Sequence, residues 1–297
     1  MDKQDRKHPL SDDSENVASV VRAGMTIRSL FSIVRLEPEE LRILLEHALG
    51  FSRVKLITHS DHVLTETEAD AVSGVLARRL RGEPVAYITG IRDFYGLPFA
   101  VTPDVLIPRP ETELLVDLAL ERLPEGGRTV DLGTGSGAIA VAIAAMRPDV
   151  EVWATDISGK ALAIARKNAA SCLKNGQSVR FRQGNWYEAL ESGSRFDLIV
   201  SNPPYIHSAD EHLQKGDLRF EPPFALTDCA DGLSALEKLA INAPAFLKSG
   251  GWLLMEHGYD QSEAVRALLS RYGLGSVQSW NDLAGVERVS GGKRAIR

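Results

Sequence analysis

The chain has 297 residues, a formal net charge of −6 and 44% hydrophobic residues, which suits one large globular domain with a small one beside it. No apolar run approaches the roughly 20 residues of a transmembrane helix. The two cysteines, Cys172 and Cys229, lack the spacing of a metal site or a disulfide framework, so neither is expected. Proteins that grip duplex DNA normally carry a basic face, and the acidic balance argues against nucleic acid as the main substrate.

The first 88 residues predict a polar tail followed by a helical domain. Residues 1–21 are low in aromatics and mixed in charge, which predicts a flexible tail; without the apolar core of a secretory signal, they also predict a cytoplasmic protein. In residues 22–88 apolar side chains recur at helical spacing, clearly so over residues 41–48. Thr65 and Glu68 form a capping box that opens a further helix.

The residue composition and the hydrophobic pattern change twice after this domain. Residues 89–108 are punctuated by Gly and Pro, which predicts an extended or hairpin linker. From residue 109 to residue 297, short apolar segments alternate with helical ones, and this order predicts a mostly parallel sheet covered on both faces. The seven strand candidates are residues 129–132, 152–155, 179–182, 197–201, 252–256, 276–280 and 287–290.

A glycine-rich loop runs from Asp131 to Gly137, after the first of these strands and before a helix. Dinucleotide sites use Gly-x-Gly-x-x-Gly with a helix end that faces a pyrophosphate, whereas here the glycines alternate. S-adenosylmethionine has no phosphate, and Asp131 or nearby carbonyls can receive its ammonium. A tight turn without a ligand is the alternative. The residues interpreted as contacting this cofactor are Gly133, Thr134, Gly135, Ser136 and Gly137.

The next two strand ends add candidates for the same cofactor. Asp156 ends the second strand, where an acidic side chain can accept hydrogen bonds from both ribose hydroxyls. Asp156 could instead cap the following helix, but Ser158 can cap it equally well. After the third strand, Asn185 and Trp186 lie where an adenine ring is expected, although Trp186 could equally be a core residue.

The loop Asn202-Pro203-Pro204-Tyr205 follows the fourth strand. Its consecutive prolines fix φ and lack a backbone N–H, so the loop is stiff before a substrate binds. The Asn202 side-chain oxygen and the Pro203 carbonyl can accept the two hydrogens of a planar –NH2 group, while the Tyr205 ring covers its flat face. We therefore interpret Asn202, Pro203 and Tyr205 as catalytic residues for methyl transfer to such a nitrogen. A proline-rich turn without function is the alternative.

Together these motifs resemble those of the release-factor glutamine methyltransferases over nearly all of the chain after the tail. The segments that carry the resemblance are residues 82–90, 106–113, 131–137, 202–205, 220–222 and 256–258. The resemblance implies a class I S-adenosylmethionine-dependent methyltransferase, with a Rossmann-like, mostly parallel seven-stranded sheet, a small helical amino-terminal domain for substrate docking, and a hairpin linker. It implies methylation of the glutamine side-chain amide in the Gly-Gly-Gln motif of class I peptide chain release factors, by a monomer without a membrane partner.

The resemblance also assigns roles to individual residues. It places residues 133–137, Asp156, Trp186 and Asn202 against the cofactor, and residues 202–205 around the glutamine. Phe94 and Arg109 are implied to line the entrance for substrate and cofactor. One departure concerns the adenine contact, because Asn185 stands where the family usually has Asp.

Three other functions remain open at this point. A DNA amino-methyltransferase would flip a base into the same proline loop, but it would need a target-recognition domain and a basic groove. A glutamine methyltransferase that acts on a ribosomal protein would use the same chemistry on a different partner. A non-catalytic module could dock on a translation factor without turnover. Finally, Glu256 could bind a polar group, but we interpret it as a solvated strand end.

Overall fold

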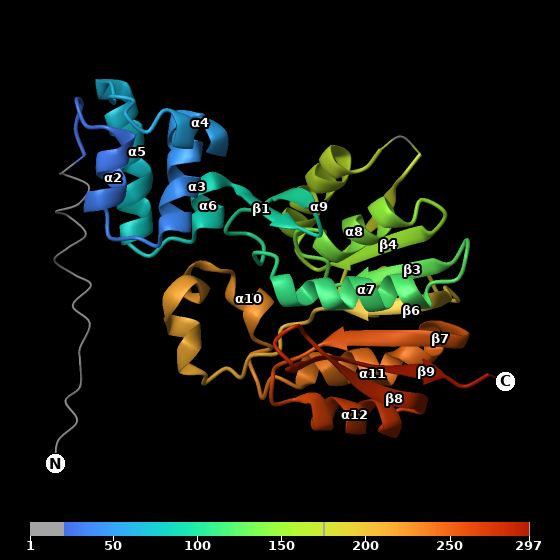
Figure 1. The fold of residues 1–297 in the computed structure, drawn as a ribbon. Coiled ribbons are helices and arrows are strands. Elements are labelled where there is room, and N and C mark those ends of the chain that lie inside the picture. The colour runs from blue at the N-terminus through green and yellow to red at the C-terminus, as the bar shows by residue number, and fades with distance from the viewer. Residues whose placement is uncertain (1–20, 175, 297) are drawn as a thin grey trace, which may run out of the picture. The chain divides into compact units, whose positions relative to one another are not determined.

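The computed structural model describes residues 21–174 and 176–296 (Figure 1). The tail expected over residues 1–21 lies, apart from Val21, outside this part of the chain. The chain divides into two compact units, with the division between Gly90 and Ile91. Each unit is described separately below.

The first unit is built from helices around one apolar core. Its core includes Leu44, Leu45 and Leu76, which are 0% exposed. Thr65 and Glu68 form the predicted capping box, with Thr65 Oγ1 accepting from the Glu68 amide at 3.3 Å. The small helical domain is therefore confirmed. The helices are α2 (Ile27–Ile33), α3 (Pro38–Leu49), α4 (Arg53–Thr58), α5 (Glu66–Leu80) and α6 (Val85–Thr89).

The second unit opens with the predicted hairpin. Strands β1 (Ile91–Phe94) and β2 (Leu97–Ala100) pair antiparallel. Both turn residues, Tyr95 and Gly96, have positive φ, at 53° and 72°. Such a turn matches the twist of the two strands it connects.

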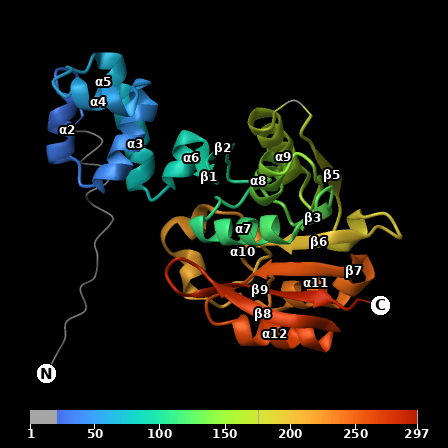
Figure 2. The same ribbon diagram turned by 45° about the vertical axis from the view of Figure 1, so that its right-hand side comes forward.

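The main sheet has seven strands in the order β5-β4-β3-β6-β7-β9-β8 (Figure 2). The five strands from β5 to β7 are parallel to one another, and β9 pairs antiparallel with both β7 and β8. The mostly parallel seven-stranded sheet is therefore confirmed. The strands are β3 (Arg128–Leu132), β4 (Glu151–Asp156), β5 (Val179–Gln183), β6 (Phe196–Ser201), β7 (Leu247–Glu256), β8 (Leu274–Asn281) and β9 (Glu287–Arg294).

Helices cover both faces of this sheet, because side chains along a strand alternate between its faces. In β6, Leu198 and Val200 pack with α7 and α8, whereas Ile199 packs with α11 and α12. The α-helices are α7 (Glu113–Arg122), α8 (Ala138–Met146), α9 (Gly159–Cys172), α10 (Pro223–Leu226), α11 (Ser234–Phe246) and α12 (Ser262–Arg271). Short 3₁₀ helices are η1 (Pro110–Thr112), η2 (Trp186–Ala189), η3 (Glu211–Gln214) and η4 (Gly216–Phe220).

The direction in which the sheet is built changes between β3 and β6. The chain adds β4 and β5 on one side of β3, and then returns to add β6 and β7 on the other side. In open α/β sheets, ligands bind at the carboxyl ends of the strands at such a point. The two strand ends are tied together here, since the Ser201 hydroxyl donates to the Leu132 carbonyl at 2.6 Å. Across the described residues, no helix combines the length and apolar character required to traverse a bilayer.

Candidate active site

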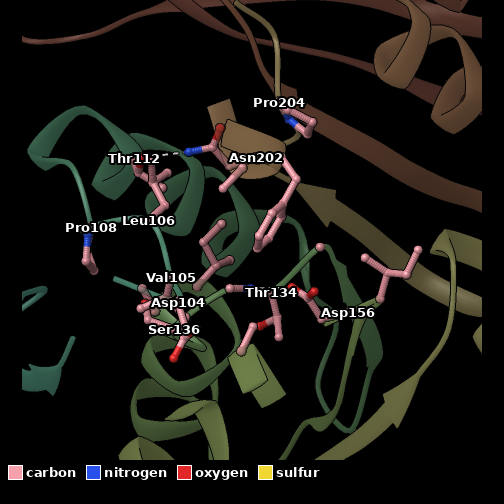
Figure 3. Close-up of a pocket in the computed structure, with 18 of the residues that line it drawn as sticks. Asp104, Val105, Leu106, Pro108, Thr112, Thr134, Ser136, Asp156, Asn202 and Pro204 are labelled. Carbon is pink, nitrogen blue, oxygen red and sulfur yellow. Dashed lines mark hydrogen bonds between the residues drawn. The ribbon is translucent and has the colours of Figure 1, made fainter. Parts of the chain in front are cut away.

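An open cavity lies at the carboxyl ends of β3, β4 and β6 (Figure 3). Including the solvent at its open mouth, it encloses about 960 Å³. Figure 3 shows Thr134, Asp156 and Asn202 around it; Asp156 is the last residue of β4, and the other two come from the loops after β3 and β6. The cavity therefore brings together the three segments that the sequence had indicated separately.

The glycine loop forms one wall of this cavity. Gly133, Thr134, Gly135 and Ser136 line it. Gly133 has a φ of 76°, and a Cβ atom there would lie 2.8 Å from the Trp186 ring. Only glycine permits both this backbone conformation and so close an approach. The loop is thus shaped by its contact with Trp186 as well as by the turn from strand to helix.

Asp156 stands at the end of β4 with its carboxylate held by backbone amides. Its Oδ2 accepts from the Gly135 amide at 2.9 Å, and its Oδ1 accepts from the Ser158 amide at 2.8 Å. Ser158 caps α9, since its hydroxyl accepts from the Ala161 amide at 3.2 Å. The interpretation of Asp156 as a ribose-binding residue required this cap. Burial raises the pKa of Asp156, while these amides oppose the rise. Each oxygen keeps a further lone pair with which it can accept a ribose hydroxyl.

Asp131 lies beneath the loop and is absent from the cavity wall. It is 0% exposed, and its Oδ2 accepts from the Thr134 hydroxyl at 2.6 Å. Within the described residues its Oδ1 makes no hydrogen bond of standard geometry. Burial raises the pKa of Asp131 to about 7, against the opposing effect of the Thr134 hydroxyl. Asp131 therefore supports the loop from below.

Trp186 and Asn185 also line the cavity, with the Trp186 ring next to Gly133. Trp186 has a φ of 51°, a left-handed conformation that bulky residues rarely adopt. Such an outlier persists where the surroundings fix it, and it is found often at binding sites. The Trp186 ring also packs against the core cluster that includes Leu132 and Tyr187, so the interpretation as a core residue describes part of its environment. Its contact with an adenine ring stays a prediction.

A second cavity adjoins the first and encloses about 540 Å³ including its mouth. Pro203 and Tyr205 line it, whereas Pro204 lines the first cavity. Asn202 and Arg109 line both. The Asn-Pro-Pro-Tyr loop therefore separates two compartments, and the Asn202 side chain stands where they meet.

The orientation of the Asn202 amide is fixed by a residue that the sequence analysis did not single out. The Asn202 Nδ2 atom donates to the Thr112 hydroxyl at 3.2 Å, drawn as a dashed line in Figure 3. Thr112 is 4% exposed and comes from η1, just after the linker. Because Nδ2 is engaged there, the Asn202 Oδ1 atom is left to accept hydrogen bonds from a ligand.

Arg109 is held by a second residue that was not singled out, Glu221. Glu221 is 3% exposed; its Oε1 accepts from Arg109, and its Oε2 accepts from the Ile107 amide at 3.1 Å. Burial raises the pKa of Glu221, and the charge of Arg109 opposes the rise. This pair fixes the segment that leads into η1, and thereby the wall shared by both cavities.

Two residues lie elsewhere than expected. Phe94 does not reach either cavity: it is 1% exposed and packs edge-on against Phe99, with ring centroids 6.0 Å apart, because β1 places it in the core. The interpretation of Glu256 as a solvated strand end is wrong, since it is 0% exposed. β7 lies between β6 and β9, and Glu256 is paired with Val289 of β9, so its strand end is covered.

The residues present fit a nucleoside-type cofactor in the first cavity. Asp156 offers fixed acceptors for ribose hydroxyls, and apolar side chains such as Leu106, Ile139 and Trp186 provide flat or aliphatic walls. A few polar groups in a largely apolar cleft are typical of cofactor sites. Within the described residues, no group of three or more His, Cys, Asp and Glu side chains is arranged to hold a metal ion.

Each of the two units matches a known protein family. Residues 110–217 match the family described as "Methyltransferase small domain", and residues 29–90 match "PrmC N-terminal domain". A release factor glutamine methyltransferase from Burkholderia pseudomallei is 51% identical, covering 90% of this chain and 96% of that protein. One from Neisseria gonorrhoeae is 50% identical, covering 91% and 98%. The crystal structure of a methyltransferase from Pyrococcus furiosus has a TM-score of 0.52 at 21% identity, covers 75% of this chain and all of that one, and shows the fold alone.

The sheet order, the glycine loop at the switch between β3 and β6, and the cavity beside it define a methyltransferase of the Rossmann-like class. Its cofactor is S-adenosylmethionine. Given identities near 50% along about 90% of its length, the chain belongs to the release factor glutamine methyltransferase family.

Proposed function

We propose that this enzyme transfers a methyl group from S-adenosylmethionine to the side-chain amide nitrogen of the glutamine in the Gly-Gly-Gln motif of class I peptide chain release factors, and so tunes translation termination. The observation that carries the proposal is the meeting of two cavities at Asn202, with its Oδ1 atom left to accept. The first cavity offers acceptors for a nucleoside, and the second is bounded by the stiff Pro203 and the ring of Tyr205.

An amide nitrogen is a poor nucleophile because its lone pair is delocalised into the carbonyl. S-adenosylmethionine supplies an electrophilic methyl group. Asn202 Oδ1 and the Pro203 carbonyl accept the two N–H groups of the glutamine amide, which draws electron density toward nitrogen as positive charge develops there. The Tyr205 ring covers the flat face of the amide and limits its rotation. No base is required before transfer, and the surplus proton leaves the nitrogen afterward.

Support for the cofactor side comes from five residues. We assign the ribose hydroxyls to Asp156, whose carboxylate two backbone amides hold in place. We assign the adenine ring to Trp186, which lines the same cavity. Thr134 and Ser136 bound the end of the cavity nearest the glycine loop. Asp131 acts indirectly, through the hydroxyl of Thr134.

We assign substrate docking to the helical domain over residues 22–88. A docking domain needs apolar side chains at its surface, and the first unit exposes Val54, Ile57 and Val63, at 68%, 67% and 54%. We further propose that the enzyme is a monomer and that it acts in the cytoplasm, where release factors meet the ribosome.

One labelling experiment tests the proposal against its rivals. The enzyme is incubated with S-adenosylmethionine labelled in the methyl group, together with a purified class I release factor, a ribosomal protein fraction or DNA. We expect label in the release factor, and none when its Gly-Gly-Gln glutamine is replaced by alanine. Label confined to DNA or to a ribosomal protein would overturn the substrate assignment, and label in no acceptor would favour a binding module without turnover.

A further inference from the structure

A buried carboxyl group lies behind the Asn-Pro-Pro-Tyr loop without lining either cavity. Glu256, the last residue of β7, is 0% exposed. Its Oε1 atom accepts from the Tyr205 hydroxyl at 3.3 Å. Its Oε2 atom is buried and makes no hydrogen bond of standard geometry within the described residues. A buried charge is costly unless it is compensated, so a carboxyl at this position requires an explanation beyond packing.

Thr112 connects this carboxyl to Asn202. The Thr112 hydroxyl accepts from Asn202 Nδ2 at 3.2 Å, and a buried hydroxyl that accepts in this way still has a proton to donate. The Glu256 carboxyl is close enough for that hydroxyl to lower its pKa by hydrogen bonding. The structure thus shows two hydrogen bonds, from Asn202 to Thr112 and from Tyr205 to Glu256. A Thr112 proton directed at the Glu256 carboxyl joins them into one hydrogen-bonded chain.

Which group donates in each of these hydrogen bonds follows from the charge of the Glu256 carboxylate. An ionised carboxylate only accepts hydrogen bonds, so both Thr112 and Tyr205 must point their protons toward it. With its proton directed to Glu256, the Thr112 oxygen can only accept from Asn202, and this keeps the amide –NH2 of Asn202 on the Thr112 side. Oδ1 then faces the junction of the cavities. A reversed amide would present N–H groups to the N–H groups of the substrate and would repel them.

We propose that Glu256 is a positioning residue that sets the polarity of the amide-binding loop, orienting Asn202 through Thr112 and the Tyr205 ring through its hydroxyl. The inference rests on the proposed glutamine-methylating function, for which it names the residue that orients the acceptor groups. Glu256 touches neither cavity, so it acts only through these two neighbours.

The charges around Glu256 make its ionisation sensitive to pH in the neutral range. Burial raises its pKa to about 7, and the charge of Glu111 adds to the rise. Thr112, Tyr205 and the charge of Arg288 oppose it. As pH falls through this value, the carboxyl gains a proton and becomes able to donate, so it no longer enforces the direction of the chain.

The test compares Glu256→Gln with a matched pair elsewhere in the protein. Gln keeps the shape of Glu but can donate through its –NH2, so we expect kcat for methyl transfer to fall about 10- to 100-fold, with KM for S-adenosylmethionine within about twofold of wild type. Glu237 also accepts a tyrosine hydroxyl, that of Tyr272 at 2.6 Å, but the pair joins α11 to α12 and lines neither cavity. Glu237→Gln should therefore leave both constants unchanged.

Three further readouts separate positioning from a general structural role. Thr112→Val should lose kcat as Glu256→Gln does, whereas Thr112→Ser, which keeps the hydroxyl, should restore it. The double variant Thr112→Val with Glu256→Gln should cost no more than Glu256→Gln alone, because Thr112 acts on Asn202 through the same carboxyl. In wild type we expect kcat to decline below about pH 7, and this decline should weaken in Glu256→Gln. Asp131 titrates in the same range, but it is present in both proteins. A difference between the two pH profiles is therefore due to Glu256.

The outcomes distinguish failure of this inference from failure of the proposed function. If wild type methylates the release factor and Glu256→Gln has normal kcat with an unchanged pH profile, Glu256 has no positioning role and the function stands. If wild type methylates no release factor, the function falls and the inference falls with it. Should Glu256→Gln not fold, the Thr112→Val and Thr112→Ser pair decides, and equal activity of those two would overturn the inference.

Discussion

Two buried carboxyl groups stand near the carboxyl ends of parallel strands in the same sheet, Asp131 in β3 and Glu256 in β7. Each has one oxygen that accepts from a hydroxyl and another without a standard hydrogen bond in the described part of the chain, and burial raises the pKa of each to about 7. They differ in what they hold. Asp131 accepts from Thr134 of the glycine loop, whereas Glu256 accepts from Tyr205 of the Asn-Pro-Pro-Tyr loop. In the proposed function, the same arrangement serves cofactor binding at the end of β3 and methyl transfer at the end of β7.

The largest expected effect lies on the amide side. Asn202→Ala removes the acceptor at the junction of the two cavities, so we expect methyl transfer to fall on the order of 100- to 1,000-fold, the usual cost of removing one group that stabilises transition-state charge. Cofactor affinity should remain measurable, because Asp156 and the glycine loop are untouched. Single-turnover transfer and equilibrium dialysis with S-adenosylmethionine measure the two quantities. The exposed Asn242→Ala on α11 is the control; wild-type transfer in Asn202→Ala would contradict the role of Asn202.

A second substitution disturbs the backbone of the same loop. Gly232 has a φ of 79°, and a Cβ atom there would lie 2.4 Å from the Tyr205 carbonyl oxygen. Gly232→Ala should therefore lower the free energy of unfolding by about 1–3 kcal/mol through overpacking. The left-handed conformation should cost about 1–2 kcal/mol more. The variant should also transfer methyl groups more slowly. Gly216→Ala is a matched control, because Gly216 has a φ of 55° with nothing within 4 Å of the added Cβ. Urea unfolding compares the two, and equal destabilisation would exclude the contact with Tyr205 as a cause.

A smaller effect is expected on the cofactor side. Asp131→Asn replaces a carboxylate acceptor of the Thr134 hydroxyl by an amide oxygen, and bonds to charged groups are stronger than neutral ones by about 1 kcal/mol. We expect about fivefold weaker cofactor binding and a nearly unchanged kcat at saturating cofactor. Initial rates at varied S-adenosylmethionine concentration measure both. A lowered kcat at saturation would show that the two carboxyls do not divide their tasks in this way.

The same comparison shows what the sequence could and could not predict. The seven strands and the glycine loop follow from local periodicity and spacing, which short segments carry by themselves. The support residues depend on partners far away in the chain: Asn202 meets Thr112 across 90 residues, Arg109 meets Glu221 across 112, and Tyr205 meets Glu256 across 51. The burial of Glu256 requires β9 to pair with β7, and the order of strands in the sheet is not written in any local pattern.

The smallest expected effect concerns stability against pH, and it should be alike for both carboxyls. Burial raises the folded-state pKa of Asp131 and Glu256 to about 7, above their ordinary values of 3.8 and 4.5. The folded state therefore holds the proton more tightly, and the resulting stability is present at low pH and lost as pH rises through 7. Over the pH unit centred on 7, the folded state holds on average about half a proton more per group than the unfolded state, so wild type should lose about 0.7 kcal/mol relative to each neutral variant.

Urea unfolding of wild type, Asp131→Asn and Glu256→Gln at pH 6.5 and 7.5 measures this difference. Only the change between the two pH values is compared, so any constant cost of placing an amide in either site cancels. A difference for Asp131→Asn but none for Glu256→Gln would mean that Glu256 stays ionised over this range. The acid decline of kcat assigned to Glu256 would then need another titrating group, and the parallel between the two strand ends would extend to their geometry but not to their ionisation.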